Sequence, residues 1–309
     1  DDDEGNIEIK GCVRNGIPEA AAEEIFNDMI SFASYAFNKS HAAAYAVISY
    51  ETGYLKAYYP VEFMAALMTS VMGDSGQIAK YIRNCNEMDI AVLPPNVNKS
   101  MKKFSVDEGK IRFGLLGVKN VGESAIAAII SSRENKGLPK DIFQFINNLE
   151  ISEMNKKAME SLIKAGAFDC LNENRTAQLA VYESLIESAQ NNSKKNITGQ
   201  MSLFQIAAEE MDVSGVSGTL PKVKNFDKKI LLAMEKEMLG VYITDHPLNE
   251  YAEKMKETAS VTSEQLVHAS EEPVSTIKDG MKVVMCGMIK GKKTLITKNN
   301  KMMAFDDLE

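Results

Sequence analysis

Long apolar runs are absent from this 309-residue sequence. The longest, Ala42–Ile48, ends at Ser49 and falls well short of the ~20 residues that a membrane-spanning helix needs. The N-terminus begins with Asp1–Glu4, which is the opposite of the basic start of a signal peptide. We therefore expect no membrane association and no secretion, and we predict a cytoplasmic protein.

Cysteine and histidine are scarce and scattered. The four cysteines are Cys12, Cys85, Cys170 and Cys286, and the sequence has three histidines. None of them forms the close pair that a zinc site uses, and no Ser/His/Asp or Cys/His arrangement is visible. We expect no metal site and no catalytic residue, and we interpret the cysteines as reduced core residues of a cytosolic protein.

Glycine and proline are also few, at 19 and 8 residues, which is below the usual fraction of these two residues in proteins. With 45 % hydrophobic and 25 % charged residues, the composition excludes both a disordered chain and a disulfide miniprotein. At ~150 residues per domain, a chain of this length is expected to contain roughly two domains. The fold class that we predict is mainly α.

The formal net charge of -8 argues at first against nucleic acid, because DNA-binding domains usually carry a basic patch. The charge is unevenly distributed, however. Lys99–Lys119 carries six bases and two acids, and Lys282–Lys301 carries six lysines and no acid. Two basic stretches in an acidic protein keep nucleic acid among the candidate partners.

Apolar residues recur at helical spacing along much of the chain. We predict helices from Pro18 to near Tyr35, over 45–59, from Pro60, and over 77–88, 123–133, 142–148, 155–165, 176–189 and 226–238. Residues 104–113 indicate a hairpin that turns at Asp107–Gly109. Near the C-terminus we expect short β pieces at 282–289, 294–297 and 302–305, separated by lysine-rich turns.

Two polar stretches, 191–196 and 213–219, are typical of exposed linkers. Between them lies the short apolar island Met201–Ile206, and the pentapeptide at its start consists of Gln200, Met201, Ser202, Leu203 and Phe204. An extended pentapeptide of this kind can place two adjacent apolar side chains in a partner's groove while Gln fixes the register. The alternative is that Leu203 and Phe204 dock back onto their own domain.

Residues 115–126 have the form of a helix-hairpin-helix turn. Such a turn presents backbone N–H groups at a helix N-terminus, where they bind a phosphate without reading bases. The candidate residues are Lys119, Asn120, Val121, Gly122 and Ser124. Asn120 stands where the turn usually has Gly, and Asn tolerates positive φ. A more degenerate copy lies at 162–169, and for both the alternative is a helix, a glycine cap and a second helix.

Two further stretches contain histidine. In Phe37–His41, Asn38 or Ser40 can cap the following helix, and a Lys39 and His41 pair beside it could instead neutralise a triphosphate. From the pattern alone the capped loop is the simpler interpretation. His246 is better explained as part of a helix-opening turn than as a catalytic base.

Five stretches together resemble the bacterial replicative DNA polymerase III alpha subunit. They follow the family's order and extend over nearly the whole chain. They are FNKSHAAAYA at 37–46, YPVEFMAA at 59–66, VLPPNVN at 92–98, GVKNVG at 117–122 and EKEMLG at 235–240. The chain is thus similar to a segment of this family that runs from the fingers to the start of the OB-fold domain.

The resemblance implies five regions. They are the C-terminal part of the fingers (1–98), a tandem helix-hairpin-helix DNA-binding domain (99–190), a linker with a clamp-binding motif (191–220), a helical connector (221–275) and the truncated start of a β-rich OB-fold (276–309).

The family consists of DNA-directed DNA polymerases whose palm aspartates hold magnesium. The resemblance places the palm before these residues, so we expect the chain alone to be inactive and without a cofactor. It also implies that Asn38, Lys39 and His41 face the incoming nucleotide, that residues 119–124 hold primer-template DNA, and that Gln200–Phe204 bind the sliding clamp, the beta subunit. Other replisome subunits are further expected partners.

A second hypothesis comes from another class: a free-standing helix-hairpin-helix DNA-binding or adapter protein with no enzymatic parent. Residues 37–66 favour the polymerase segment, because an adapter has no use for them.

Overall fold

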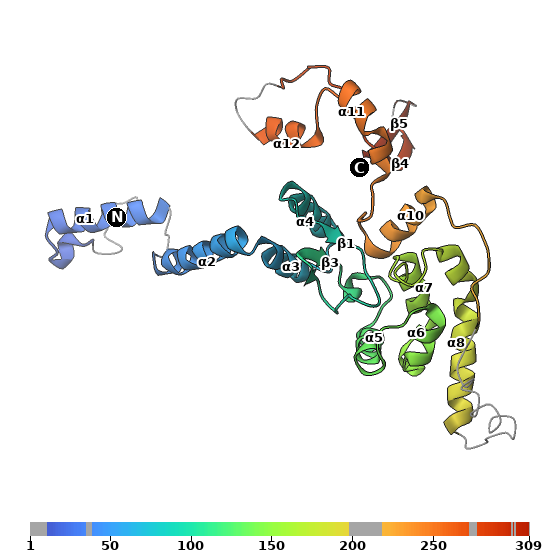
Figure 1. The fold of residues 1–309 in the computed structure, drawn as a ribbon. Coiled ribbons are helices and arrows are strands. Elements are labelled where there is room, and N and C mark those ends of the chain that lie inside the picture. The colour runs from blue at the N-terminus through green and yellow to red at the C-terminus, as the bar shows by residue number, and fades with distance from the viewer. Residues whose placement is uncertain are drawn as a thin grey trace. The chain divides into compact units, whose positions relative to one another are not determined.

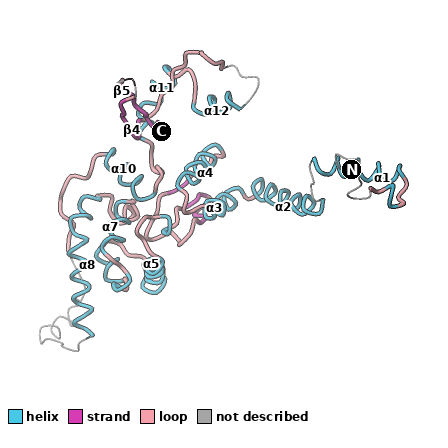
Figure 2. The backbone as a smooth tube through the Cα atoms, turned by 180° about the vertical axis from the view of Figure 1, so that it is seen from behind, coloured by secondary structure: helices cyan, strands magenta, loops and turns pink. Residues whose placement is uncertain are grey.

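The computed structural model describes residues 11–34, 39–197, 218–271, 277–297, 299 and 301–308. The mainly α prediction is confirmed, since helices dominate the described residues, whose strands form only a small three-stranded sheet and a two-stranded ribbon (Figures 1 and 2). The chain divides into two units, Asp1–Phe63 and Met64–Glu309. Among the described helices, none is long and apolar enough to cross a membrane.

The first unit contains a short 3-10 helix, η1 (Val13–Asn15), and two helices, α1 (Glu19–Ser34) and α2 (Lys39–Tyr58). Pro18 precedes α1, and its carbonyl accepts a hydrogen bond from Ala22 N at 3.0 Å. No residue of α2 is buried. The helix predicted to open at Pro60 is α3 (Pro60–Ser70), which crosses the boundary between the units.

The second unit continues with α4 (Ser75–Glu87), whose N-terminal amides are capped by the side chain of Asp74. The strands β1 (Val92–Leu93), β2 (Ser105–Asp107) and β3 (Lys110–Arg112) form a sheet in the order β1-β3-β2. The β2–β3 pair confirms the predicted hairpin. Glu108 and Gly109 both have positive φ, 53° and 77°, as the favoured two-residue hairpin turn requires.

A run of helices follows the sheet (Figure 1), and their side chains supply much of the core. They are η2 (Leu115–Gly117), α5 (Glu123–Lys136), α6 (Ile142–Asn148), α7 (Lys156–Lys164) and α8 (Arg175–Ile197), with a 3-10 turn, η3 (Ile151–Glu153), before α7. Asp141 and Asn155 cap α6 and α7. At the centre, the rings of Phe145 and Phe168 pack edge to face with centroids 4.8 Å apart.

Helix α8 continues through residues 191–197, so the first residues of the predicted linker are helical, and the region boundary at 191 stays a prediction. Residues 191–197 contain no Gly or Pro, the two residues that most disfavour a helix. Of the expected linker, residues 198–217 lie outside the described residues.

The region predicted to be a helical connector contains α10 (Lys228–Leu239), η4 (Pro247–Tyr251), α11 (Ala252–Thr258) and α12 (Ser263–Glu271). Gly240 ends α10 with φ 77°, and a Cβ there would lie 2.7 Å from Ser75 Cβ, so both the turn and the packing require glycine. The expected turn at His246 is confirmed: its Nδ1 accepts a hydrogen bond from Leu248 N at 3.2 Å and opens η4.

The C-terminal ribbon consists of β4 (Ile289–Ile296) and β5 (Met302–Leu308), paired antiparallel. The expected β piece at 282–289 is wrong apart from its last residue, and the lysine-rich turn expected within 290–293 lies inside β4. Cross-strand pairing with β5, which no local pattern reveals, keeps these lysines in a strand.

Candidate functional site

The helix-hairpin-helix turn joins η2 to α5 and rests on a buried aromatic ring. A Cβ at Gly117 would lie 2.5 Å from Phe113 Cε1, so only glycine lets the turn approach this ring. Asn120 has φ 64°, which confirms the positive φ predicted for it. Two residues therefore shape the turn: Asn120 adopts the left-handed conformation, and Gly117 allows the backbone to approach the ring of Phe113.

Burial alternates along the turn. Val118, Val121 and Ala125 are buried, whereas Lys119, Asn120, Gly122, Glu123 and Ser124 are exposed. The buried side chains anchor the turn to the core. The predicted phosphate-binding residues, except Val121, are therefore exposed to solvent.

Two long-range hydrogen bonds hold the turn in place. Lys119 N donates to Met238 O of α10 at 3.0 Å, and Asn120 Nδ2 donates to Ser161 Oγ of α7 at 3.0 Å. Sequence reasoning missed both Met238 and Ser161. For Ser161 a weak signal existed, because it is a polar residue on the otherwise apolar face of a predicted helix.

The N-terminus of α5 is suited to an anion. Gly122 is its N-cap residue with φ -82°, and no side chain caps the first turn. A Cβ at Gly122 would meet nothing within 4 Å. The first amides of a helix without a side-chain cap, together with the helix dipole, bind phosphate groups.

Ion pairs neutralise half of the predicted basic stretch. Lys99 pairs with Asp107 and Glu108, Arg112 pairs with Asp107, and Lys102 Nζ lies 2.9 Å from Glu123 Oε1. Hydrogen bonding to Arg112, and then to Lys99, lowers the pKa of Asp107. The remaining cations, Lys103, Lys110 and Lys119, make no ion pair with another described residue. The positive potential at the turn is thus smaller than the sequence suggested.

The second hairpin candidate, 162–169, is closed by the protein's own cation. The Arg175 guanidinium donates to Asp169 and to the carbonyl of Lys164, and it lies against Gly166. Gly166 N and Ala167 N are bonded to carbonyls of α7. Because this turn is buried and filled, it offers a phosphate no exposed amide.

The other predicted residues lie elsewhere. Lys39 and His41 are exposed in the first turn of α2, where the His41 and Tyr45 ring centroids are 4.3 Å apart. Ser40 lies within that helix rather than at its cap, and Asn38 is outside the described residues, as are Gln200–Phe204. No cluster of three His, Cys, Asp or Glu residues with metal-binding geometry occurs in the described part of the chain.

Comparisons with known proteins agree on one family. Residues 89–178 match the family model of the helix-hairpin-helix motif. The DNA polymerase III subunit alpha of Thermus aquaticus is 40% identical over 296 residues, which are 96% of this chain and 23% of that protein. The same subunit of Mycobacterium tuberculosis is 41% identical over 246 residues, 78% of this chain and 20% of that protein. That of Escherichia coli is 32% identical over 305 residues, 98% of this chain and 26% of that protein.

The chain spans 20% to 26% of the length of these relatives. The similarity reaches far beyond the helix-hairpin-helix residues, which a free-standing adapter would not explain. The chain belongs to the DNA polymerase III alpha subunit family, of which it covers one segment.

Proposed function

We propose that this segment holds primer-template DNA by its backbone while the whole alpha subunit, with magnesium in its palm, carries out template-directed DNA synthesis in the cytoplasm. The observation that carries the proposal is the exposed N-terminus of α5, which has no side-chain cap and has free space beside Gly122. Backbone amides grip phosphates without reading bases. Binding is therefore indifferent to sequence, as a replicase requires.

The experiment is a titration of the chain with labelled duplex DNA at several salt concentrations. Gly122→Val adds a branched side chain where the phosphate approaches, and we expect affinity to fall about tenfold or more, since charge-assisted hydrogen bonds are worth about 1.5–3 kcal/mol. Lys119→Ala should weaken binding and reduce the slope of log affinity against log salt by about one.

Gly73→Val is the matched control, because Gly73 is also exposed and a Cβ there meets nothing within 4 Å. This variant should bind DNA as the parent does. Duplex affinity that is equal in Gly122→Val and Gly73→Val, with both folded, would remove the hairpin from the DNA-binding surface.

We further propose that Gln200–Phe204 bind the sliding clamp. The proposal is supported by the sequence alone: Leu203 and Phe204 are adjacent apolar residues in a mostly polar stretch. Burying two such side chains contributes about 1.5–3 kcal/mol each, less the cost of ordering the segment. Micromolar affinity corresponds to ~8 kcal/mol and is the expected scale.

Clamp binding is tested with the double variant Leu203→Ala, Phe204→Ala, measured by titration with purified clamp. We expect clamp binding to be lost while duplex binding and thermal stability stay nearly unchanged. Ile206→Ala, two residues beyond the motif, should retain clamp binding. A large loss of stability in the double variant would mean that Leu203 and Phe204 pack into their own domain, and it would contradict the assignment.

Three further roles follow from the family. Lys39 and His41, with Asn38, would face the incoming nucleotide, residues 276–309 would begin an OB-fold, and other replisome subunits would be partners. Lys39 and His41 are solvent-exposed in α2, which leaves their side chains accessible to a triphosphate.

A further inference from the structure

A cleft of about 480 Å³ lies between α4 and the loop that follows α10. Four residues of α4 line it at positions i, i+3, i+4 and i+7, which share one face of a helix. They are Ala79, Ile82, Arg83 and Asn86. From the loop, Tyr242 and His246 complete the set of residues that decides the chemistry of this cleft. None of the hairpin residues 115–126 lines it, and neither do Lys39 and His41.

The two walls of the cleft are held together by close packing and by buried hydrogen bonds. A Cβ at Gly240, where α10 ends, would lie 2.7 Å from Ser75 Cβ at the start of α4. Glu235 is fully buried, and its carboxylate accepts hydrogen bonds from Ile243 N at 2.5 Å and from Thr244 N at 3.0 Å. The loop is therefore fixed to α10 and α10 to α4, so the cleft is a built feature of the fold.

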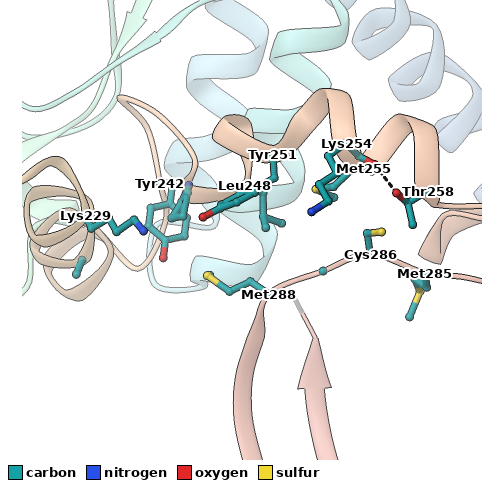
Figure 3. Close-up of a pocket in the computed structure, with 13 residues that line it drawn as sticks. Lys229, Tyr242, Leu248, Tyr251, Lys254, Met255, Thr258, Met285, Cys286 and Met288 are labelled. Carbon is teal, nitrogen blue, oxygen red and sulfur yellow. Dashed lines mark hydrogen bonds between the residues drawn. The ribbon is translucent and has the colours of Figure 1, made fainter.

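Tyr242 supplies the aromatic ring of the cleft. Lys236 Nζ lies 4.7 Å from the centroid of this ring, and the ring of His246 packs against it edge to face with centroids 4.9 Å apart. Figure 3 shows Tyr242 in a larger cavity that it also lines, together with Lys229 and Leu248. That cavity is mostly apolar, whereas the cleft collects polar groups and positive charge around the ring.

One acid, Asp245, lies among the described residues that line the cleft, and the protein itself neutralises it. Its carboxylate pairs with Lys228 and accepts hydrogen bonds from His246 N at 2.8 Å and from Asn249 Nδ2 at 2.5 Å. Hydrogen bonding to Lys228, and then to Asn249, lowers the pKa of Asp245 to about 2. The carboxylate is thus ionised and already paired, so it does not cancel the charge of the cations in the cleft.

Three residues of the lining have donors that no other described residue uses. The side chains of Arg83 and Asn86 are exposed and make no hydrogen bond or ion pair within the described part of the chain. His246 Nδ1 accepts a hydrogen bond from Leu248 N at 3.2 Å, so the neutral imidazole carries its proton on Nε2. A guanidinium beside further N–H donors is a set of groups that binds phosphate.

We infer that this cleft binds a free nucleoside monophosphate, with its phosphate on Arg83 and its base against Ile82 and the ring of Tyr242. A flat base packs well on an aromatic ring, and the amide of Asn86 offers both a donor and an acceptor to the base edge. The volume falls within the range of small-molecule sites, ~300–1,000 Å³. The site goes beyond the DNA and clamp proposals and does not depend on them.

A single phosphate suits the cleft better than a DNA strand does. The positive charge of the lining comes from Arg83 and Lys236, whereas a strand is bound by cations repeated along its backbone. Inorganic phosphate alone would satisfy Arg83 but would leave the apolar side chains of the lining without a partner. A monophosphate with its base engages both parts.

The experiment measures binding of adenosine, guanosine, cytidine and uridine monophosphates to the purified chain by titration calorimetry. We expect at least one of them to bind with a Kd below about 1 mM, and its nucleoside and inorganic phosphate to bind at least about tenfold more weakly. Arg83→Ala should weaken binding by about tenfold or more, because charge-assisted hydrogen bonds to the phosphate are lost. Lys80→Ala is the matched control, since Lys80 is an exposed cation of α4 outside the cleft, and it should bind as the parent does.

A covalent probe guards against an indirect effect of Arg83→Ala. In the unmodified chain, an azido derivative of the monophosphate that binds should label residues within 79–86 or 241–246 on irradiation, as read by mass spectrometry. An excess of the unlabelled monophosphate should suppress this labelling. Labels confined to other residues would overturn the inference.

Failure of all four monophosphates to bind, or unchanged binding by folded Arg83→Ala, would also overturn it. Inorganic phosphate that binds as tightly as the monophosphate would show that the cleft holds an anion and not a nucleotide. Duplex DNA that displaces the bound monophosphate, together with weaker duplex binding by Arg83→Ala, would assign the cleft to the DNA-binding surface and overturn the inference as well.

Discussion

Asn120 makes two separate contributions at the hairpin. Its backbone adopts the left-handed conformation, with φ 64°, and its side-chain amide donates to Ser161 Oγ. Ser161 is only 3% exposed, so this hydrogen bond joins the turn to the interior of α7. The residue type alone predicted the positive φ. The partner, 41 residues away in the sequence, could not be predicted, because it depends on how α7 packs.

We predict that Asn120→Gly lowers the free energy of unfolding by about 1 kcal/mol, the usual net worth of one hydrogen bond. Asn120→Ala should cost about 2 kcal/mol, because it loses the same bond and because Ala tolerates the left-handed conformation less well than Asn does. Urea denaturation measures both. Ser161→Ala is the control, and combining it with Asn120→Gly should add little. Fully additive effects would contradict the coupling.

At the scale of elements, local signals predicted most boundaries, and long-range pairing decided the rest. The β2–β3 hairpin and α6 were predictable because turn residues and apolar periodicity are local. Strand β4 was not, since a lysine-rich stretch favours a turn until β5 pairs with it. Likewise, nothing near 162–169 predicts that Arg175 fills the second hairpin, although Gly166 suggested a turn.

The β2–β3 hairpin also carries a pH-dependent ion pair. Asp107 accepts hydrogen bonds from Arg112 Nε and Nη2 at 3.0 and 2.6 Å, which lowers its pKa. A carboxylate with a lowered folded-state pKa stabilises the fold above its unfolded pKa of ~3.9 and loses that contribution as the pH falls through the folded value.

We predict that Asp107→Asn reduces the free energy of unfolding by about 1–3 kcal/mol at pH 7, because the nearly buried Arg112 loses its charged partner. The difference from the parent should shrink as the pH falls below ~4. Glu108→Gln is the control: Glu108 is 82% exposed, so this change should stay within about 0.5 kcal/mol. Denaturation curves from pH 7 to pH 3 test the prediction, and a difference that does not vary with pH would contradict it.

At the scale of the whole molecule, sequence and structure carry different parts of the functional argument. Short motifs in a fixed order predicted the family, which no single site could do. The structure then distinguished the two hairpin candidates, because the first is exposed and the second is closed by Arg175. It also showed which lysines of the basic stretch form ion pairs. The five-region division stays a prediction, and the boundary between the two units, at Phe63 and Met64, falls inside the region assigned to the fingers.

We predict that the chain by itself does not extend a primer. Nucleotidyl transfer by two metal ions needs carboxylates that are held close together on a rigid framework. The adjacent acids Asp306 and Asp307 lie on β5, where successive side chains point to opposite faces of the ribbon, so they cannot share one metal pair. Purified chain incubated with primer-template DNA, deoxynucleotides and magnesium should give no extension, while a full-length DNA polymerase III alpha subunit, as positive control, should extend the same primer. Primer extension that copurifies with the chain and is lost in Asp306→Asn would place catalytic carboxylates in the ribbon. That result would contradict the proposal that this segment binds DNA without catalysing its synthesis.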